Sequence, residues 1–337
     1  MKAAMLYGPR DIRIEDIDPP NPSFGEILVK IKAVGICPSD LRGYTGARKP
    51  EEGYPVTIGH EWAGEIVEAS PSCRDFTVGD RVAAMWASFC GQCYYCRKGE
   101  QSHCQHRWGH TMGGFMEYGR SPASSLRKLT DTTSFEEATF AEPLACCLNG
   151  NRKLNIKVGD FVAVVGEGPI GLTHVQLAKL SGAARIIAIG LIPERLKLAE
   201  KLGADYSINA GEQDAVEEVT RLTDGRGADA VQIAVGGVKA IESGIQMADI
   251  GGTVNIFAGT HPTTSISVDP NLIHYKELVV TGSWDYTPHL FTKSMELINT
   301  KRINIKDMIS HILPLEEAAK GFEIVEKREG LKVVIRI

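Results

Sequence analysis

The sequence predicts an α/β fold in which a doubly wound parallel sheet is joined to a β-rich domain. Up to about residue 150, short strand-like runs such as EILVKIKAVGI and GHEWAGEIVEA are broken by Gly and Pro. From about residue 155, strand-like runs alternate with helical ones, which is the pattern of a parallel sheet. The closing run LKVVIRI again resembles a strand of the β-rich domain.

The elements of the second half are expected in a fixed order. The strands DFVAVVG and ARIIAIG flank a helix from about Pro169 to Leu180, and four further strand-like runs precede a helix near 288–299. We therefore predict a doubly wound domain over 152–287 and a β-rich domain over 1–151 and 288–337. A chain of 337 residues suits two domains, and a cleft between them is the expected binding site.

The composition is that of an ordinary globular protein. Hydrophobic residues make up 43% and charged residues 23%, and the formal net charge is −5. Neither a nucleic-acid partner nor a membrane surface is indicated, so a small-molecule substrate is expected. The N-terminus MKAAMLYGPRDIRIEDI lacks the apolar core of a signal peptide, and no later stretch approaches membrane-spanning length. We expect a cytoplasmic protein.

Four cysteines crowd into the lobe near 88–106 with the spacing C-x2-C-x2-C-x7-C. Four thiolates close the coordination sphere of one ion, which is typical of structural zinc. An iron–sulfur cluster is the main alternative, because the first three spacings resemble a ferredoxin run, but the usual Pro after the last cysteine is absent. A nucleic-acid zinc ribbon would need a longer hairpin between its cysteine pairs. The four residues are Cys90, Cys93, Cys96 and Cys104.

A second set of metal ligands stands far from this lobe in the sequence. Cys37 lies in GICPSD, and His60 and Glu61 lie in GHEWAGE. A thiolate, an imidazole and a carboxylate form the ligand set of a zinc ion that keeps one position open for water or substrate. Taken singly, Cys37 is also explained as a buried thiol, His60 as a core histidine and Glu61 as a surface charge.

The run VAVVGEGPIGL carries the spacing G-x-G-x-x-G directly after an apolar strand and at the start of a helix. The first glycine permits the tight turn, the second admits the pyrophosphate, and the third lets helix and strand pack closely. The helix N-terminus then faces the phosphates. The sequence therefore predicts dinucleotide binding by Gly166, Gly168, Pro169, Ile170 and Gly171.

The end of the second strand of this unit bears on the choice between NAD and NADP. An NAD enzyme usually presents Asp or Glu there to the adenosine ribose, whereas this chain has Gly190. Without that carboxylate a 2′-phosphate is admissible, and Arg195 is near enough in sequence to reach it. We therefore expect either nucleotide, with NADP favoured.

These motifs occur in an order that resembles the zinc-containing medium-chain alcohol dehydrogenase family, over essentially the whole chain. The resemblance implies a GroES-like catalytic domain completed by the C-terminus, a Rossmann domain, two zinc ions per chain, and hydride transfer between an alcohol and NAD(P). It implies that Cys37 and His60 bind the catalytic zinc, with Glu61 either a ligand or exchanging with water. Glu142, in AEPLACC, matches an acidic ligand of polyol and threonine dehydrogenase-like members. Asp40 resembles the carboxylate that orients His60.

The same resemblance assigns Ser39 to a proton relay from the alcohol. Many relatives end this relay in a histidine where this chain has Arg42, which cannot act as a base. Relatives are usually dimers or tetramers, so a homodimer or homotetramer is expected. Two alternatives are a zinc-free NADPH quinone or enoyl reductase and a non-catalytic, zinc-braced nucleotide-binding protein.

Several other residues are assigned to packing or to solvent. Aromatic side chains that could line the cleft are more often part of a core or interface; these are Tyr44, Trp86, Trp108 and Trp284. The remaining thiols, Cys73, Cys146 and Cys147, are expected to be buried. The histidines beside the cysteine lobe, His103, His106 and His110, are expected to be solvated.

Overall fold

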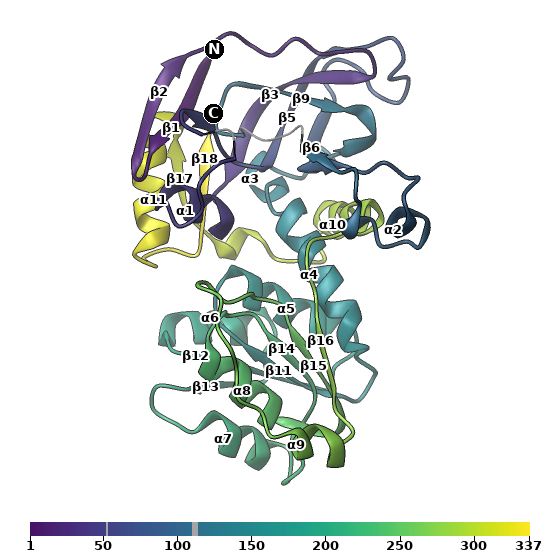
Figure 1. Ribbon diagram of the computed structural model, residues 1–337, viewed down its shortest axis with the longest axis vertical. Coiled ribbons are helices and arrows are strands. Elements are labelled where there is room, and N and C mark those ends of the chain that lie inside the picture. The colour runs from purple at the N-terminus through teal and green to yellow at the C-terminus, as the bar shows by residue number, and fades with distance from the viewer. Residues whose placement is uncertain (52, 110–113) are drawn as a thin grey trace. The chain divides into compact units, whose positions relative to one another are not determined.

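A computed structural model describes residues 1–51, 53–109 and 114–337 of the chain. It divides into two compact units, which are described separately. Unit 1 consists of Met1–Ala145 and Thr287–Ile337, and unit 2 of Cys146–Tyr286. Both chain termini lie in unit 1 (Figure 1). The C-terminal segment therefore returns to the unit that contains the N-terminus.

Unit 1 is built on a seven-stranded sheet with the order β10-β6-β5-β3-β18-β17, and β9 also pairs with β3. Its central strand β3 alternates in burial, with Ile27, Val29 and Ile31 fully buried on one face, as expected for a sheet with one apolar side. A three-stranded sheet, β2-β1-β4, and a two-stranded sheet, β7-β8, complete the unit.

The elements of unit 1 have the following bounds. The strands are β1 (Lys2–Gly8), β2 (Asp11–Asp16), β3 (Glu26–Gly35), β4 (Val56–Thr57), β5 (Glu61–Ala69), β6 (Arg81–Ala84), β7 (Ala87–Ser88), β8 (Trp108–Gly109), β9 (Tyr118–Pro122), β10 (Leu126–Lys128), β17 (Ile309–Pro314) and β18 (Lys332–Arg336). The α-helices are α1 (Pro38–Tyr44), α2 (Tyr94–Arg97), α3 (Phe135–Ala138), α10 (Pro288–Asn299) and α11 (Ala318–Glu326), while α4 (Ala141–Leu154) continues into unit 2. Short 3-10 turns are η1 (Gln101–His103), η2 (Ala123–Ser125), η3 (Lys306–Met308) and η4 (Leu315–Glu317). Strand β17 and helix α11 were not predicted from the sequence.

Unit 2 contains a six-stranded parallel sheet with helices packed around it (Figure 1). The strand order is β13-β12-β11-β14-β15-β16, which is the 3-2-1-4-5-6 order of the Rossmann fold. The strands are β11 (Phe161–Val165), β12 (Arg185–Gly190), β13 (Tyr206–Asn209), β14 (Ala228–Ile233), β15 (Ala248–Ile256) and β16 (Val279–Gly282). The helices are α5 (Pro169–Leu180), α6 (Pro193–Leu202), α7 (Ala215–Leu222), α8 (Val238–Gln246) and α9 (Pro270–Tyr275). The predicted α/β fold class is thus confirmed.

Local sequence explains why the central strands of unit 2 lie where they do. Almost every residue of β11 and β12 is buried, because a parallel sheet covered on both faces needs apolar runs rather than alternation. Helix α7 begins after Asp214, whose carboxylate accepts hydrogen bonds from the N–H groups of Val216 and Glu217.

In the described residues, every helix is too short or too polar to cross a bilayer.

Candidate metal centres and nucleotide-binding turn

The four cysteines of the lobe converge on one point in unit 1. Their sulfur atoms all lie within 4.8 Å of one another. The sulfurs of Cys90 and Cys96 are 3.9 Å apart, and those of Cys90 and Cys104 are 3.5 Å apart. Four sulfurs around one zinc ion at about 2.3 Å would be separated by roughly 3.8 Å. The geometry therefore fits a single tetrahedral ion, whereas a multi-iron cluster between the sulfurs would hold them further apart.

Backbone groups of the same loop also favour the thiolate form. The N–H groups of Cys93 and Gln92 point at the Cys90 sulfur at 3.3 and 3.5 Å. These N–H groups hold the pKa of the Cys90 thiol below its ordinary value. Gly91 and Gly99 have φ angles of +70° and +85°, which let the chain fold back on itself twice within the lobe. The loop therefore has a shape that suits a bound cation.

The open set of ligands is also brought together. The ligand atoms of Cys37, His60 and Glu61 lie within 4.8 Å of one another. Antiparallel pairing of β3 with β5 places Gly35 opposite Glu61, so Cys37, two residues beyond Gly35, comes next to the start of β5. Burial, and then the charge of Glu61, raise the pKa of the Cys37 thiol. A thiol and a carboxylate packed this closely suit a bound cation, which favours both negative charges.

Asp40 orients the imidazole of His60. One carboxylate oxygen of Asp40 lies 3.1 Å from Nδ1 of His60, and the other accepts the backbone N–H of Cys37 at 3.1 Å. With Nδ1 engaged in this way, Nε2 is the atom that remains to bind a metal. Burial favours a neutral ring, but the charges of Asp40 and Cys37 and their hydrogen bonds together outweigh it and raise the pKa of His60 well above its usual value. Asp40 itself is buried in the first turn of α1.

Lys332 is part of this centre, and the sequence analysis did not identify it. Its ammonium group bonds the carboxylate of Glu61, and both side chains are almost fully buried. It also donates to the backbone carbonyl of Ile36 at 3.2 Å. Burial lowers the pKa of Lys332, but the charges of Glu61, Cys37 and Glu142, together with the hydrogen bond to Glu61, outweigh this and leave the pKa raised. Lys332 comes from β18, which pairs with β3, and no local motif marks it.

Gly35 makes room for the ion pair. A Cβ atom on Gly35 would collide with the Glu61 carboxylate and would lie 2.7 Å from Cε of Lys332. Glu142, at the start of α4, is buried, and its charge also raises the pKa of Lys332. The structure does not place its carboxylate in the group formed by Cys37, His60 and Glu61. Its role as a zinc ligand stays a prediction.

The remaining predicted residues are placed as follows. Ser39 is half-buried in the first turn of α1, and Arg42 lies in the last turn of the same helix. Tyr44 is a core residue stacked on Phe322 with ring centroids 4.9 Å apart, and Arg107 lies 4.7 Å above the Trp86 ring. Cys73 and Cys147 are buried, whereas Cys146 is only partly buried, which corrects the expectation for that residue. Among the other residues, Trp284 is 55% exposed, His103 and His106 are exposed, and His110 and the Trp108 side chain lie outside the described parts.

The glycine-rich turn in unit 2 joins β11 to α5. Gly166 has a φ angle of +114°, which a residue with a side chain rarely adopts. A Cβ atom on Gly171 would collide with the carbonyl oxygen of Gly166, so helix and strand can meet there only at a glycine. Gly168 caps α5, whose first residue is Pro169, and open space surrounds Gly168. This turn has the shape that a pyrophosphate requires.

Glu167, between the first two glycines, is a second residue that the sequence analysis overlooked. Its Oε1 accepts the backbone N–H groups of Leu191 and Ile192 at 3.0 and 3.2 Å. Its carboxylate therefore lies at the end of β12, beside Gly190. Arg195 is partly buried in α6, one turn into that helix.

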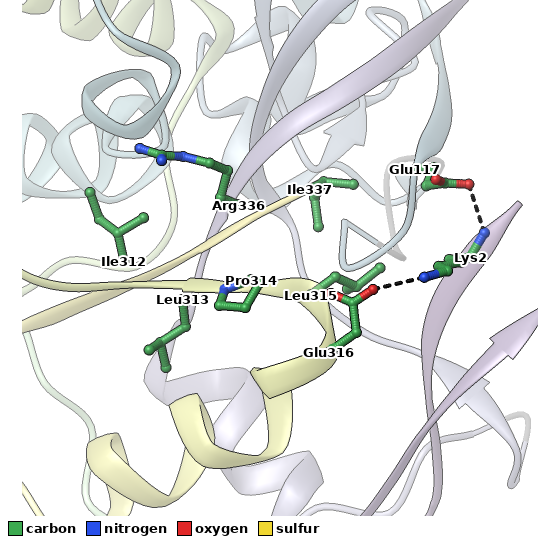
Figure 2. A pocket seen from close by; sticks show the side chains of 9 residues that line it. All are labelled: Lys2, Glu117, Ile312, Leu313, Pro314, Leu315, Glu316, Arg336 and Ile337. Carbon is green, nitrogen blue, oxygen red and sulfur yellow. Dashed lines mark hydrogen bonds and ion pairs between the residues drawn. The ribbon is translucent and has the colours of Figure 1, made fainter.

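A surface pocket of about 440 Å³ lies elsewhere in unit 1 (Figure 2). It is lined by the end of the edge strand β17, the residues after it, the end of the chain, and Lys2 with Glu117. An ion pair of 2.8 Å joins Lys2 to Glu316 at its rim, and both side chains are more than half exposed. None of the predicted metal ligands or nucleotide contacts lines this pocket.

Comparison with known proteins gives two family matches. Residues 23–131 match the alcohol dehydrogenase GroES-like domain, and residues 169–300 match the zinc-binding dehydrogenase model. Sorbitol dehydrogenase of Halalkalibacterium halodurans is 36% identical, with 98% of this chain and 96% of that protein covered. L-threonine 3-dehydrogenase of Pyrococcus abyssi is 34% identical, with 100% and 97% covered.

Solved structures agree with these sequence relatives. The 2R,3R-butanediol dehydrogenase of Bacillus subtilis has a TM-score of 0.90 at 31% identity, over 100% of this chain and 99% of that one. A Sinorhizobium meliloti 1021 protein solved with NADP bound has a TM-score of 0.94 at 31% identity, over 100% and 99%. The likeness therefore extends through both units of the chain.

Proposed function

Because this chain belongs to the zinc-containing medium-chain alcohol dehydrogenase family, we propose that it binds one zinc ion at the four-cysteine group and one at the group of Cys37, His60 and Glu61, and that it oxidises a secondary alcohol of a polyol or sugar. It is an NAD(P)-dependent alcohol dehydrogenase. The observation that carries the two-zinc proposal is the coexistence of a closed four-sulfur group with an open group of three ligand atoms. The first has the geometry of a structural ion and the second that of a catalytic one.

The residues of the open group would have separate tasks. Cys37 and His60 would bind the ion, and Asp40 would hold the His60 ring in the metal-binding tautomer. When bound, zinc supplies the acidity that lets an alcohol hydroxyl lose its proton near neutral pH. Glu61, shared with Lys332, would either bind the ion or stay with the ammonium group. Hydride transfer further requires the alcohol carbon and the nicotinamide to be held in one oriented complex.

Ser39 would take the proton from the substrate hydroxyl on its Oγ. It stands two residues after Cys37, in the first turn of α1. Since Arg42 cannot act as a base, the relay would continue elsewhere than in relatives that have histidine there. The variant S39A should lower kcat at least tenfold and shift the alkaline limb of the pH profile while zinc content stays at two per chain. An unchanged profile would remove Ser39 from the relay.

Polyols are favoured as substrates for two reasons. Glu142 stands where polyol and threonine dehydrogenase-like members have an acidic residue, and it is buried near Lys332. Relatives covering nearly the whole chain include sorbitol, erythritol/L-threitol and L-threonine 3-dehydrogenases. The test is a panel of polyols, sugars, simple secondary alcohols and threonine, assayed by reduced-nicotinamide absorbance with NAD and NADP in parallel. Turnover confined to threonine or to simple alcohols would overturn the polyol proposal.

Assembly into a homodimer or homotetramer is supported by the edge of the unit 2 sheet. Strand β16 ends the sheet, and its Val279 and Val280 are 54% and 36% exposed. An exposed apolar edge strand offers unpaired backbone groups to a second copy. Light scattering of the purified protein should give a mass of two or four chains, and V279K/V280K should reduce that mass.

A cytoplasmic location is supported by the cysteines. All eight are described and none forms a disulfide, which suits the reducing cytoplasm.

A further inference from the structure

The end of β12 lacks the acidic side chain that nicotinamide enzymes usually direct at the adenosine ribose. Gly190 is the last residue of that strand, and Leu191 and Ile192 follow it. In a dinucleotide-binding unit, a carboxylate at this place accepts hydrogen bonds from the ribose hydroxyls and repels a 2′-phosphate. The sequence by itself therefore favours NADP.

The structure places another carboxylate at the same spot. A Cβ atom on Gly190 would lie 2.6 Å from both Cδ and Oε2 of Glu167. The carboxylate of Glu167 thus occupies the space that a longer side chain at position 190 would fill. Glu167 reaches it from the glycine-rich turn, across the adjacent strands β11 and β12. The missing side chain of Gly190 is what makes that space available.

Two hydrogen bonds hold the group there. Oε1 of Glu167 accepts from the N–H groups of Leu191 and Ile192, the residues that lead into α6. Oε2, the other oxygen, lies on the side of the empty Cβ position of Gly190. Bonds from two backbone N–H groups fix the orientation of the carboxylate. One oxygen anchors the side chain, and the second lies where the ribose is recognised.

We propose that Glu167 supplies the ribose-binding carboxylate that Gly190 lacks, and that it thereby selects NAD over NADP. This inference rests on the proposed nucleotide-binding function and specifies its cofactor. The 2′- and 3′-hydroxyls of the adenosine ribose donate to Oε2, whereas the 2′-phosphate of NADP would bring a second negative charge against it. Leu191 and Ile192 provide no positive charge to offset that repulsion, so Arg195, in the first turn of α6, is the cation against which the charge of Glu167 acts. The preference for NADP expected from Gly190 is reversed, because Glu167 places a carboxylate at the position where the side chain of residue 190 is missing.

The test is equilibrium binding of NADH and NADPH to the zinc-loaded full chain without substrate, followed by nucleotide fluorescence. Wild type should bind NADH at least about tenfold more tightly than NADPH, the size expected for a charge-assisted hydrogen bond. The variant E167Q keeps an oxygen that can accept from Leu191 and Ile192 but removes the charge. It should bind NADPH about tenfold more tightly than wild type does and bind NADH more weakly.

The converse experiment moves the carboxylate from position 167 to position 190. Truncation in E167A clears the space over Gly190, so the double variant E167A/G190D can place an aspartate there. It should recover the NADH preference that E167A loses. The matched control is E194Q, which removes an exposed carboxylate from the first turn of α6 and should leave the ratio unchanged. Melting temperatures measured without nucleotide show whether each variant is folded.

The outcomes separate the two proposals. Binding of neither nucleotide by folded wild type would refute the nucleotide-binding function itself, and this inference with it. If wild type binds both nucleotides but binds NADPH as tightly as NADH or more tightly, the role of Glu167 is refuted. The same holds if E167Q does not change the ratio of the two affinities. Neither result would contradict the dehydrogenase function. An NADH preference abolished by E167Q and restored by E167A/G190D would support it.

Discussion

The ammonium group of Lys332 bonds the carboxylate of Glu61 inside unit 1, where the two side chains are 5% and 1% exposed. The two residues are 271 positions apart in the chain, and Glu61 also lies among the proposed ligands of the catalytic zinc. Lys332 therefore balances a negative charge that would otherwise be buried beside Cys37. It also competes with a bound cation for the same carboxylate.

Removing the ammonium group should destabilise the protein strongly. K332M would leave the Glu61 carboxylate buried without its counter-charge, at a cost of about 3 kcal/mol in the free energy of unfolding. Chemical denaturation followed by circular dichroism measures this loss. K332R should retain most of the stability. K320M, which breaks the exposed pair of Lys320 with Glu317, should change the free energy of unfolding by less than about 0.5 kcal/mol. If K320M and K332M lost the same amount of stability, the predicted importance of the buried pair would be contradicted.

Loss of one lobe cysteine should remove one zinc ion. C96S takes away a buried sulfur of the four-sulfur group, so metal analysis should fall from two zinc ions per chain to one. C73S removes a buried thiol that belongs to neither group and should retain two ions. A content of two in C96S would contradict the assignment of the lobe as a metal site.

Asp40 should control zinc affinity at the open site. D40N preserves the size of the side chain but weakens its hold on Nδ1 of His60, so zinc affinity or kcat should drop about 10- to 100-fold. Competition with a chelator measures the affinity directly. D75N, on an exposed loop, serves as the control and should behave as wild type. Equal zinc affinity in D40N and wild type would show that Asp40 has only a structural role.

Acid should destabilise unit 2 through His174. This side chain is 1% exposed in α5, its ring contacts Phe257 at 5.0 Å, and among the described residues neither ring nitrogen has a hydrogen-bond partner. Burial lowers its pKa to about 3. The unfolded chain therefore binds a proton that the folded chain excludes, and stability is lost as pH falls below about 6.5 towards 3.

The size of this acid effect can be measured. Between pH 6.5 and 5, His174 should contribute a loss of about 2 kcal/mol, from about 1.4 kcal/mol per pH unit. Denaturation at both pH values should show a smaller loss in H174L than in wild type. H261Q, a change at an exposed histidine, should keep the wild-type slope. Parallel slopes for wild type and H174L would contradict the prediction.

Much of the architecture follows from local sequence. The α/β class was predictable because apolar strands of unit 2 alternate with helices, and the helix from Pro169 to Leu180 was expected with the bounds it has. The elements β17 and α11 were not predicted, because the segment before LKVVIRI has no clear strand or helix signal. Family and enzyme class were also predictable, because the order of the ligand motifs and the glycine-rich turn is specific, and both are confirmed by the relatives.

The residue types that can bind metal and nucleotide are evident from the sequence alone, because cysteine spacing and the glycine pattern act over a few neighbouring residues. Which charged groups come into contact depends on the tertiary structure. Lys332 reaches Glu61 through the pairing of β18 with β3, and Glu167 reaches Gly190 across two parallel strands. Neither contact has a local signature, since electrostatic partners are chosen by distance in space, and that distance exists only once the sheets have formed.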